Sequence, residues 1–271
     1  MADGNNKNGN TTEAVVRVAA VSDLHCTRTS RGAYQKLLNQ IAESAEVLVI
    51  CGDLTDHGLP EEAEVLAKEL SVAAKLPTVA VLGNHDFESG QEREVCRILG
   101  DAGVTILDGD AKEIRGVGFA GVKGFCGGFG RGTLSAFGEP AIKEFVKESL
   151  NEVMKLESAL ARLQTPQRVA VLHYAPTRET VEGESPEIFP FLGSSRLEEP
   201  LNRYQVAVAL HGHAHKGAPE GHTSVGIPVY NVSMPVMKAA FPDRPAFRLL
   251  EMHVTRKAQP PHRVPVATDV P

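Results

Sequence analysis

The sequence lacks a long hydrophobic run. Its longest apolar stretches, residues 47–51 and 206–210, are short, whereas a helix that crosses a bilayer needs about 20 apolar residues. The first twelve residues, MADGNNKNGNTT, contain no apolar segment, so we expect no secretory signal. The pattern predicts a protein without a membrane partner.

Basic residues are in the minority. The chain has 28 Lys and Arg against 34 Asp and Glu, with a formal net charge of −6 and a sequence pI of about 5.9. Proteins that bind nucleic acids or anionic membranes usually carry a basic excess or a basic stripe. We therefore do not expect nucleic acid as a partner.

Cysteine is scarce, and its four copies show no C-x-x-C spacing: Cys26, Cys51, Cys96 and Cys126. This pattern lacks a disulfide framework and is typical of a reducing compartment, where a free Cys behaves as a small buried residue. The expected location is cytoplasmic. Cys26, next to His25, is expected to serve in packing.

The two ends of the chain differ from its centre. Residues 1–13 are rich in Asn and Gly, and residues 257–271 are rich in Pro, so both are expected to be disordered tails. Residues 14–256 show no internal repeat and no linker, which predicts a single domain. The sequence leaves the oligomeric state open.

Strand and helix patterns alternate in the first half of this domain. The apolar segments 14–21, 46–51 and 77–82 are each followed by helical spacing, in residues 31–45, 61–76 and 91–102. This rhythm is typical of a parallel sheet covered by helices.

The second half predicts a second sheet. Residues 103–125 suggest an antiparallel hairpin that turns at 108–110, and residues 139–164 have the apolar stripe of a long helix. Further strands are expected at 168–176, 206–213, 227–233 and 246–254. Gly116, Gly118 and Gly121 match G-x-G-x-x-G, but no helix pattern follows, so a strand is expected there and not a dinucleotide site.

Five short segments place polar side chains where an apolar strand ends. They contain the following candidates: Asp23 and His25, Asp53, Asn84 with His85 and Asp86, His173, and His213 with His215. The carboxyl ends of parallel strands converge at one edge of a sheet. We therefore expect these side chains to meet, although a hydrated, His-rich loop at 211–215 is an alternative interpretation of the last segment alone.

The residue types favour transition metals. Asp23 and Asp53 supply carboxylates, Asn84 an amide oxygen, and four histidines imidazoles. These are too many ligands for one tetrahedral zinc and suit two ions that share a bridging carboxylate, Asp53. Imidazole-rich sites select Mn, Fe or Zn over Mg or Ca. His211, deeper in its strand, is expected to pack or to support the ligands.

The order D-x-H, G-D, G-N-H-[DE], H, G-H-x-H resembles the calcineurin-like metallophosphoesterase superfamily. The resemblance implies a four-layer α/β/β/α sandwich of two mixed sheets flanked by helices, with the site at one sheet edge. It implies a first ion held by Asp23, His25, Asp53 and His215. It implies a second ion held by Asp53, Asn84, His173 and His213, with His85 facing the substrate.

These residues predict a phosphoesterase. A hydroxide that bridges the ions is the expected nucleophile, because metals lower the pKa of bound water. His85, oriented by Asp86, is the expected general acid. The expected substrate is a small-molecule phosphate ester, either a phosphodiester or a small nucleotide. Alternatives are a phosphomonoesterase or nucleotidase at the same site, and a non-catalytic scaffold of the same fold.

Differences between this sequence and the motifs of other members of the superfamily narrow the range of expected substrates. The chain reads GDLTDHG, with His57 where protein phosphatases and diadenosine tetraphosphatases of the superfamily usually have Arg. The motifs look most like class III cyclic nucleotide phosphodiesterases. Specificity is expected in two loops, 124–132 with Phe129 and Arg131, and 175–195 with Arg178; a mobile turn is an alternative for the first.

Overall fold

The computed structural model describes residues 11–257, and residues 1–10 and 258–271 of the two expected tails lie outside the described part. Strand β1 (Thr11–Val21) pairs antiparallel with β11 (Arg248–Lys257) along nearly its whole length. Residues 11–13 and Lys257, which the sequence pattern assigns to the tails, are therefore part of this ladder. Because these residues are polar in the sequence, a search for apolar segments does not extend the strands to them.

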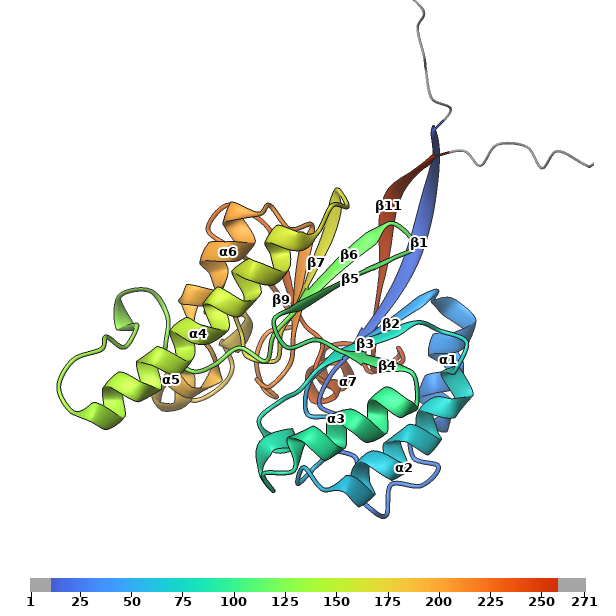
Figure 1. Ribbon diagram of the computed structural model, residues 1–271, viewed down its shortest axis with the longest axis horizontal. Coiled ribbons are helices and arrows are strands. Elements are labelled where there is room, and N and C mark those ends of the chain that lie inside the picture. Colours follow the sequence, from blue (N-terminus) through green and yellow to red (C-terminus); the bar gives the residue numbers. More distant parts are fainter. Residues whose placement is uncertain (1–10, 258–271) are drawn as a thin grey trace, which may run out of the picture.

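The first sheet has the order β11-β1-β2-β3-β4 (Figure 1). Strands β1 to β4 are parallel to one another, and β11 is antiparallel at the edge. Its further elements are β2 (Val47–Cys51), β3 (Thr78–Val81) and β4 (Val104–Ile106), joined through α1 (Gln35–Ser44), α2 (Pro60–Leu70) and α3 (Glu92–Asp101). The expected alternation of strands and helices is confirmed.

The second sheet has the order β5-β6-β7-β8-β10-β9. Strands β6, β7, β8 and β10 are parallel, while β5 and β9 are antiparallel at the edges. The strands are β5 (Asp110–Ile114), β6 (Val117–Gly121), β7 (Gln167–Val171), β8 (Val208–His211), β9 (Glu220–His222) and β10 (Pro228–Asn231). The helices of this half are α4 (Pro140–Arg162), α5 (Phe189–Leu192), α6 (Glu198–Arg203) and α7 (Met234–Ala240).

Alternate residues of each strand face different layers, as a pleated strand requires. In β1, Val18 and Ala20 pack between the two sheets, whereas Ala19 and Val21 face the cluster that includes the apolar side chains of α1, α2 and α3. On the far side, Leu156 and Leu160 of α4 cover the outer face of the second sheet. The order is helix, sheet, sheet, helix, which confirms the predicted four-layer α/β/β/α sandwich.

Two expectations about the strands are wrong. Residues 108–110 are no hairpin turn, because β4 ends the first sheet and the chain then crosses to the second. The hairpin joins β5 to β6 and turns at Arg115 and Gly116, which both have positive φ. Strand β11 also belongs to the first sheet and not the second.

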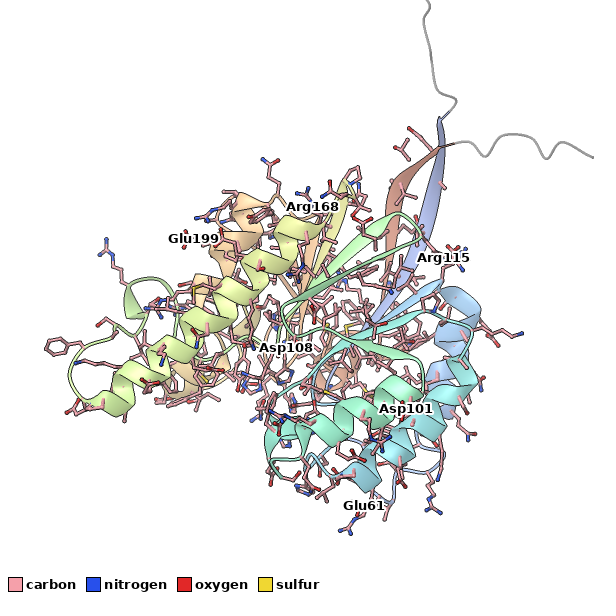
Figure 2. All side chains as sticks on the ribbon, viewed as in Figure 1. Glu61, Asp101, Asp108, Arg115, Arg168 and Glu199 are labelled. Carbon is pink, nitrogen blue, oxygen red and sulfur yellow. The ribbon has the colours of Figure 1, made fainter. Side chains whose placement is uncertain are left out.

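Gly118 and Gly121 of the glycine-rich segment lie in strand β6, as expected, while Gly116 lies in the turn before it. A Cβ on Gly121 would lie 2.7 Å from Cβ of Leu107 and 2.8 Å from Cγ1 of Val81, so glycine permits the two sheets to approach. Charged side chains such as Glu61, Asp101 and Glu199 project from the outer helices (Figure 2). In the part of the chain that the structure describes, no helix is long and apolar enough to cross a membrane.

Candidate active site

The site lies where parallel strands of both sheets end. Asp23 follows β1, Asp53 follows β2 and Asn84 follows β3, while His173 follows β7 and His213 follows β8. Because the two sheets are stacked, their carboxyl ends meet at one edge, as the topology rule for α/β sheets requires. Residues up to 192 positions apart in the sequence are therefore in contact.

One group of polar atoms forms around Asp23. Nε2 of His215 lies 3.0 Å from Oδ1 of Asp23 and 3.5 Å from Nε2 of His25. Nε2 of His25 lies 3.7 Å from Oδ2 of Asp53. Two donors bound to one ion at about 2.1 Å are about 3 to 3.5 Å apart, so these four side chains fit one metal ion.

A second group forms around His173. Its Nε2 lies 2.9 Å from Oδ1 of Asn84 and 3.4 Å from Oδ1 of Asp53. The ring of His213 is 4.9 Å from that of His173, and ligand atoms of Asp53, His173 and His213 lie within 4.8 Å of one another. This group also has the size of a site for one ion.

Asp53 is shared by the two groups. Its Oδ1 faces His173 in the second group, and its Oδ2 faces His25 in the first. The backbone N–H of His85 donates to Oδ1 at 3.0 Å and fixes the orientation of the carboxylate. The two oxygens of one side chain therefore point into two neighbouring donor clusters.

The backbone is strained at these positions. Of the six non-glycine residues with positive φ in residues 11–257, four are Asp23, His25, Asp53 and His213. Positive φ costs free energy for a residue with a Cβ and is tolerated where the surrounding structure enforces it, often at functional sites. The fold thus holds these side chains in place at a cost in stability.

The two-residue period of a strand does not determine the positions of His211, His213 and His215. Strand β8 ends at His211, and His213 adopts a φ of 68° in the following loop. His213 and His215 therefore reach their separate groups through the loop backbone and not through the alternation of side chains along a strand. His211 is buried, with Nε2 2.8 Å from Oγ1 of Thr180.

Glycine is required beside His173. Gly52 has a φ of 89°, and a Cβ there would lie 2.4 Å from Nδ1 of His173. That nitrogen donates to the carbonyl of Cys51 at 2.9 Å. The contact leaves Nε2 free to act as a ligand, because a carbonyl acceptor fixes the imidazole tautomer. The carbonyl of Phe191 lies 3.2 Å from Nε2 of His213. A hydrogen bond from Nε2–H to this carbonyl leaves Nδ1 of His213 as the nitrogen that can act as a ligand.

The charges at the site also fit bound cations. Asp23, Asp53 and Asp86 are almost fully buried, and in residues 11–257 no Lys or Arg lies within 4 Å of their oxygens. Burial, followed by the carboxylates of Asp23 and Asp86, raises the pKa of Asp53 to about 9. Burial lowers the pKa of His173 and His213, which keeps both in the neutral, metal-binding form.

The side chain of Asp86 does not orient His85, in contrast to the expectation. The carboxylate of Asp86 is turned into the fold, where it accepts hydrogen bonds from the N–H groups of Thr55 at 2.8 Å and Gly83 at 2.8 Å. Nδ1 of His85 instead donates to the backbone carbonyl of Asp56 at 2.6 Å. In a 3-10 turn, successive side chains point in different directions, so Asp86 cannot orient His85.

Sequence reasoning missed the supporting groups Asp56, Cys51 and Phe191. Each has a backbone carbonyl that contacts a histidine of the site, and a carbonyl leaves no mark in the residue type. Asp56 in addition places its Oδ1 3.2 Å from Nδ1 of His25. Asp56 stands in the GDLTD segment, where its position after Asp53 is the one available signal. Cys26 is buried, as expected.

The candidate substrate contacts Phe129, Arg131 and Arg178 are not members of the two donor clusters. The ring of Phe129 packs into an apolar cluster with Ala175, Val181, Leu192 and Ala214. Arg131 is exposed, and Arg178 is exposed with Glu182 as its partner at 3.7 Å. The 124–132 loop is fixed by Gly127 and Gly128, whose N–H groups donate to Pro190 and Gly193. It is therefore joined to the 175–195 loop by backbone hydrogen bonds.

The comparison with protein families agrees with the geometry. The calcineurin-like phosphoesterase family matches residues 16–217, more than half of the chain. The chain therefore belongs to the calcineurin-like phosphoesterase family, whose members are metal-dependent hydrolases of phosphoesters. The predicted family and enzyme class are confirmed.

Known relatives are distant. A curated protein of Arcobacter nitrofigilis named "Probable glycerophosphodiester phosphodiesterase GpdQ" is 22% identical over 224 residues, which cover 73% of this chain and 71% of that protein. The phosphopantetheinyl hydrolase PptH of Mycobacterium tuberculosis has a similar structure, with a TM-score of 0.62 and 16% identity over 92% of this chain and 98% of that one. The protein TT1561 of Thermus thermophilus has a TM-score of 0.51 and 17% identity, over 83% of this chain and 92% of that one. The structural likeness supports the fold.

Proposed function

We propose that the protein is a dinuclear metal-dependent phosphodiesterase that acts on a small-molecule phosphate ester. The observation that carries the proposal is the position of Asp53, whose two oxygens face two donor clusters. A carboxylate in that position suits a ligand shared by two ions. The imidazole content favours Mn, Fe or Zn.

Each donor cluster has a defined role in this proposal. Asp23, His25 and His215 would hold the first ion together with Asp53; Asn84, His173 and His213 would hold the second. When bound, the two ions lower the pKa of coordinated water from about 16 towards about 7 and stabilise the charge on the phosphoryl oxygens. The carbonyls of Cys51 and Phe191 keep the rings of His173 and His213 in the required tautomer.

His85 would donate the proton to the leaving group. Its ring packs edge-on against that of His25 at a centroid distance of 4.5 Å and is partly exposed. With Nδ1–H bound to the carbonyl of Asp56, the imidazolium form of the ring carries its second proton on Nε2, from which it can be given to the substrate. A side chain in that position acts as a general acid in the departure of an alkoxide.

A diester substrate agrees with the name of the curated relative, a probable glycerophosphodiester phosphodiesterase. A phosphomonoesterase or nucleotidase activity uses the same groups and is the second candidate. The cytoplasmic location stays a prediction from the cysteine pattern.

The test is hydrolysis of bis-p-nitrophenyl phosphate and of p-nitrophenyl phosphate. We expect turnover with Mn²⁺, loss of turnover after chelation, and faster cleavage of the diester than of the monoester at equal concentration. Faster cleavage of the monoester would support the second candidate. A protein with two ions bound that hydrolyses neither ester would instead be a scaffold of the same fold.

A further inference from the structure

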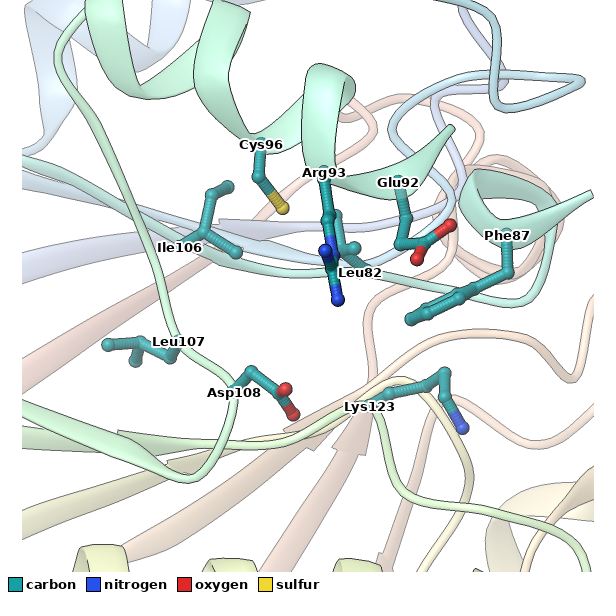
Figure 3. A pocket seen from close by; sticks show the side chains of 9 residues that line it. All are labelled: Leu82, Phe87, Glu92, Arg93, Cys96, Ile106, Leu107, Asp108 and Lys123. Atoms are coloured by element: carbon teal, nitrogen blue, oxygen red, sulfur yellow. The ribbon is translucent and has the colours of Figure 1, made fainter. Parts of the chain in front are cut away.

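A cavity of about 380 Å³ opens between α3 and the end of the first sheet (Figure 3). Its apolar wall consists of Leu82, Phe87, Cys96, Ile106 and Leu107. Phe87 is 40% exposed, and its ring points into the open space (Figure 3). The cavity has the volume and the lining of a small-molecule site.

Two residues that line the cavity form backbone hydrogen bonds with residues of the candidate active site. The N–H of Phe87 donates to the carbonyl of Asn84 at 3.2 Å. The carbonyl of Lys123 accepts from the N–H of His173 at 3.0 Å. Both Asn84 and His173 belong to the second donor cluster, and Phe87 is two residues beyond His85. The cavity therefore borders the segments that carry Asn84, His85 and His173.

Two cations face the cavity without an acidic partner. In residues 11–257, no carboxylate lies within 4 Å of Arg93 or Lys123. The guanidinium of Arg93 points from α3 into the open space (Figure 3). Of the two acidic residues at the rim, Asp108 is paired with Lys155 at 2.8 Å, which leaves Glu92. Among the residues that line the cavity, the charges without a partner within 4 Å are therefore positive on balance, while Glu152 and Glu148 act on Lys123 from a greater distance.

Lys123 is held in place and has free donors. Its ammonium lies 5.6 Å from the ring centroid of Phe87, 4.8 Å from that of Phe125 and 5.4 Å from that of Tyr174. It donates one hydrogen bond, to the carbonyl of Gly124 at 2.8 Å. An ammonium group has three N–H donors, so two remain for a ligand.

We propose that this cavity binds the leaving group of the substrate, and that the preferred leaving group is an alcohol with an apolar or aromatic body and an anionic substituent. The body would lie against Phe87 and Ile106, and the anion would bind Arg93 and Lys123. This inference rests on the proposed phosphodiesterase function and adds its substrate class.

The test compares two phosphodiesters of the same shape, methyl 4-carboxyphenyl phosphate and methyl 4-carbamoylphenyl phosphate. They differ by one negative charge on the leaving group. We expect the wild-type KM to be about tenfold lower for the carboxylate, the effect of one charge-assisted hydrogen bond. Lys123→Met and Arg93→Met should each remove most of that preference and leave the KM of the carbamoyl ester within about twofold.

Arg97→Met is the matched control. Arg97 lies on the same helix, is paired with Glu94 and Asp101, and does not line the cavity. We expect it to change neither KM. Equal KM values for the two esters in the wild type would overturn the proposal, as would an equal rise for both esters in Lys123→Met.

A binding measurement separates this inference from the proposed function. The chain contains four Tyr but no Trp, so Phe87→Trp places a single Trp at the cavity, whose fluorescence can be excited apart from that of Tyr. Saturable quenching by methyl 4-carboxyphenyl phosphate, with weaker quenching by the carbamoyl ester, would support the cavity even if no ester is hydrolysed. Hydrolysis of bis-p-nitrophenyl phosphate without any such quenching would reject the cavity and keep the phosphodiesterase.

Discussion

The backbone carbonyl of Asp56 lies 2.6 Å from Nδ1 of His85. The contact is independent of the Asp56 side chain, whose Oδ1 lies 3.2 Å from Nδ1 of His25. Asp56 thus touches both the proposed acid and a proposed ligand, through different atoms. The orientation of His85 is fixed by the fold of the GDLTD segment, which leaves its Nε2 directed away from this anchor.

Replacement of the His85 ring should slow the reaction without loss of bound metal. We expect His85→Ala to retain its metal content and to slow the hydrolysis of diesters with poor leaving groups by ~10²-fold, because these need a proton at the departing oxygen. Esters of p-nitrophenol should be affected less. The measurements are kcat for a series of aryl and alkyl diesters, with the metal content of each preparation.

His57→Ala serves as the control for this variant. His57 is also near Asp56, at 3.3 Å from its Oδ2, but its side chain is 55% exposed. We expect its kcat to match the wild type across the series. An equal loss of rate for good and poor leaving groups in His85→Ala would contradict the role of a proton donor.

Asp53→Asn should affect both ions. The amide has the size of the carboxylate but lacks its charge and can offer one oxygen, so neither donor cluster keeps its shared ligand. We expect the metal content to fall from two ions to well below one per chain and turnover to be lost. Elemental analysis after gel filtration measures this, with the exposed Asp110→Asn as control. Retention of two ions would show that Asp53 does not bridge.

We expect Asp86 to stabilise the folded state. Its buried carboxylate binds the N–H groups of Leu54, Thr55 and Gly83 and the hydroxyl of Thr55. Asp86→Ala leaves these donors unpaired, which we expect to lower the free energy of unfolding by about 3 kcal/mol or more. Urea denaturation measures the change.

The exposed Asp101→Ala is the comparison, because its pair with Arg97 lies at the surface. Such pairs contribute about 0 to 1 kcal/mol. If Asp86→Ala were as stable as Asp101→Ala and slower only in turnover, the assignment of Asp86 to the fold would be wrong.

The sequence could predict where the site forms but not how it is supported. Asp23, Asp53 and His173 each follow an apolar strand, and parallel topology brings such positions together without further information. The direction of the Asp86 side chain depends on the 3-10 turn at His85–Phe87, which no local pattern in GNHD specifies. The carbonyls of Cys51 and Phe191 carry no residue-type signal at all.

The fold shows the same limit. Most strands were recognisable by their apolar residues, although the polar strand β9, Glu220–His222, was not. The place of β11 beside β1 is set by the pairing of segments near opposite ends of the chain, such as Thr11 with Lys257. Long-range pairing depends on which edge is free once the parallel core has formed. The cavity at Phe87 and Lys123 was also beyond reach, because its walls come from four segments, 82–87, 92–96, 106–108 and Lys123, of which only the first contains a motif.

Metal removal should destabilise the folded protein. Without cations, the buried carboxylates of Asp23 and Asp53 have imidazoles but no Lys or Arg as partners within 4 Å in residues 11–257. A ligand at a hundred times its Kd stabilises the folded state by about 2.7 kcal/mol, so we expect chelation to lower Tm by ~5–10 °C. Addition of Mn²⁺ or Zn²⁺ should restore both Tm and turnover, and Mg²⁺ should do so less well, because imidazole ligands favour transition metals. Asp53→Asn should show little response to the chelator. A wild-type protein whose Tm and turnover are both unchanged by chelation would contradict the metal centre itself.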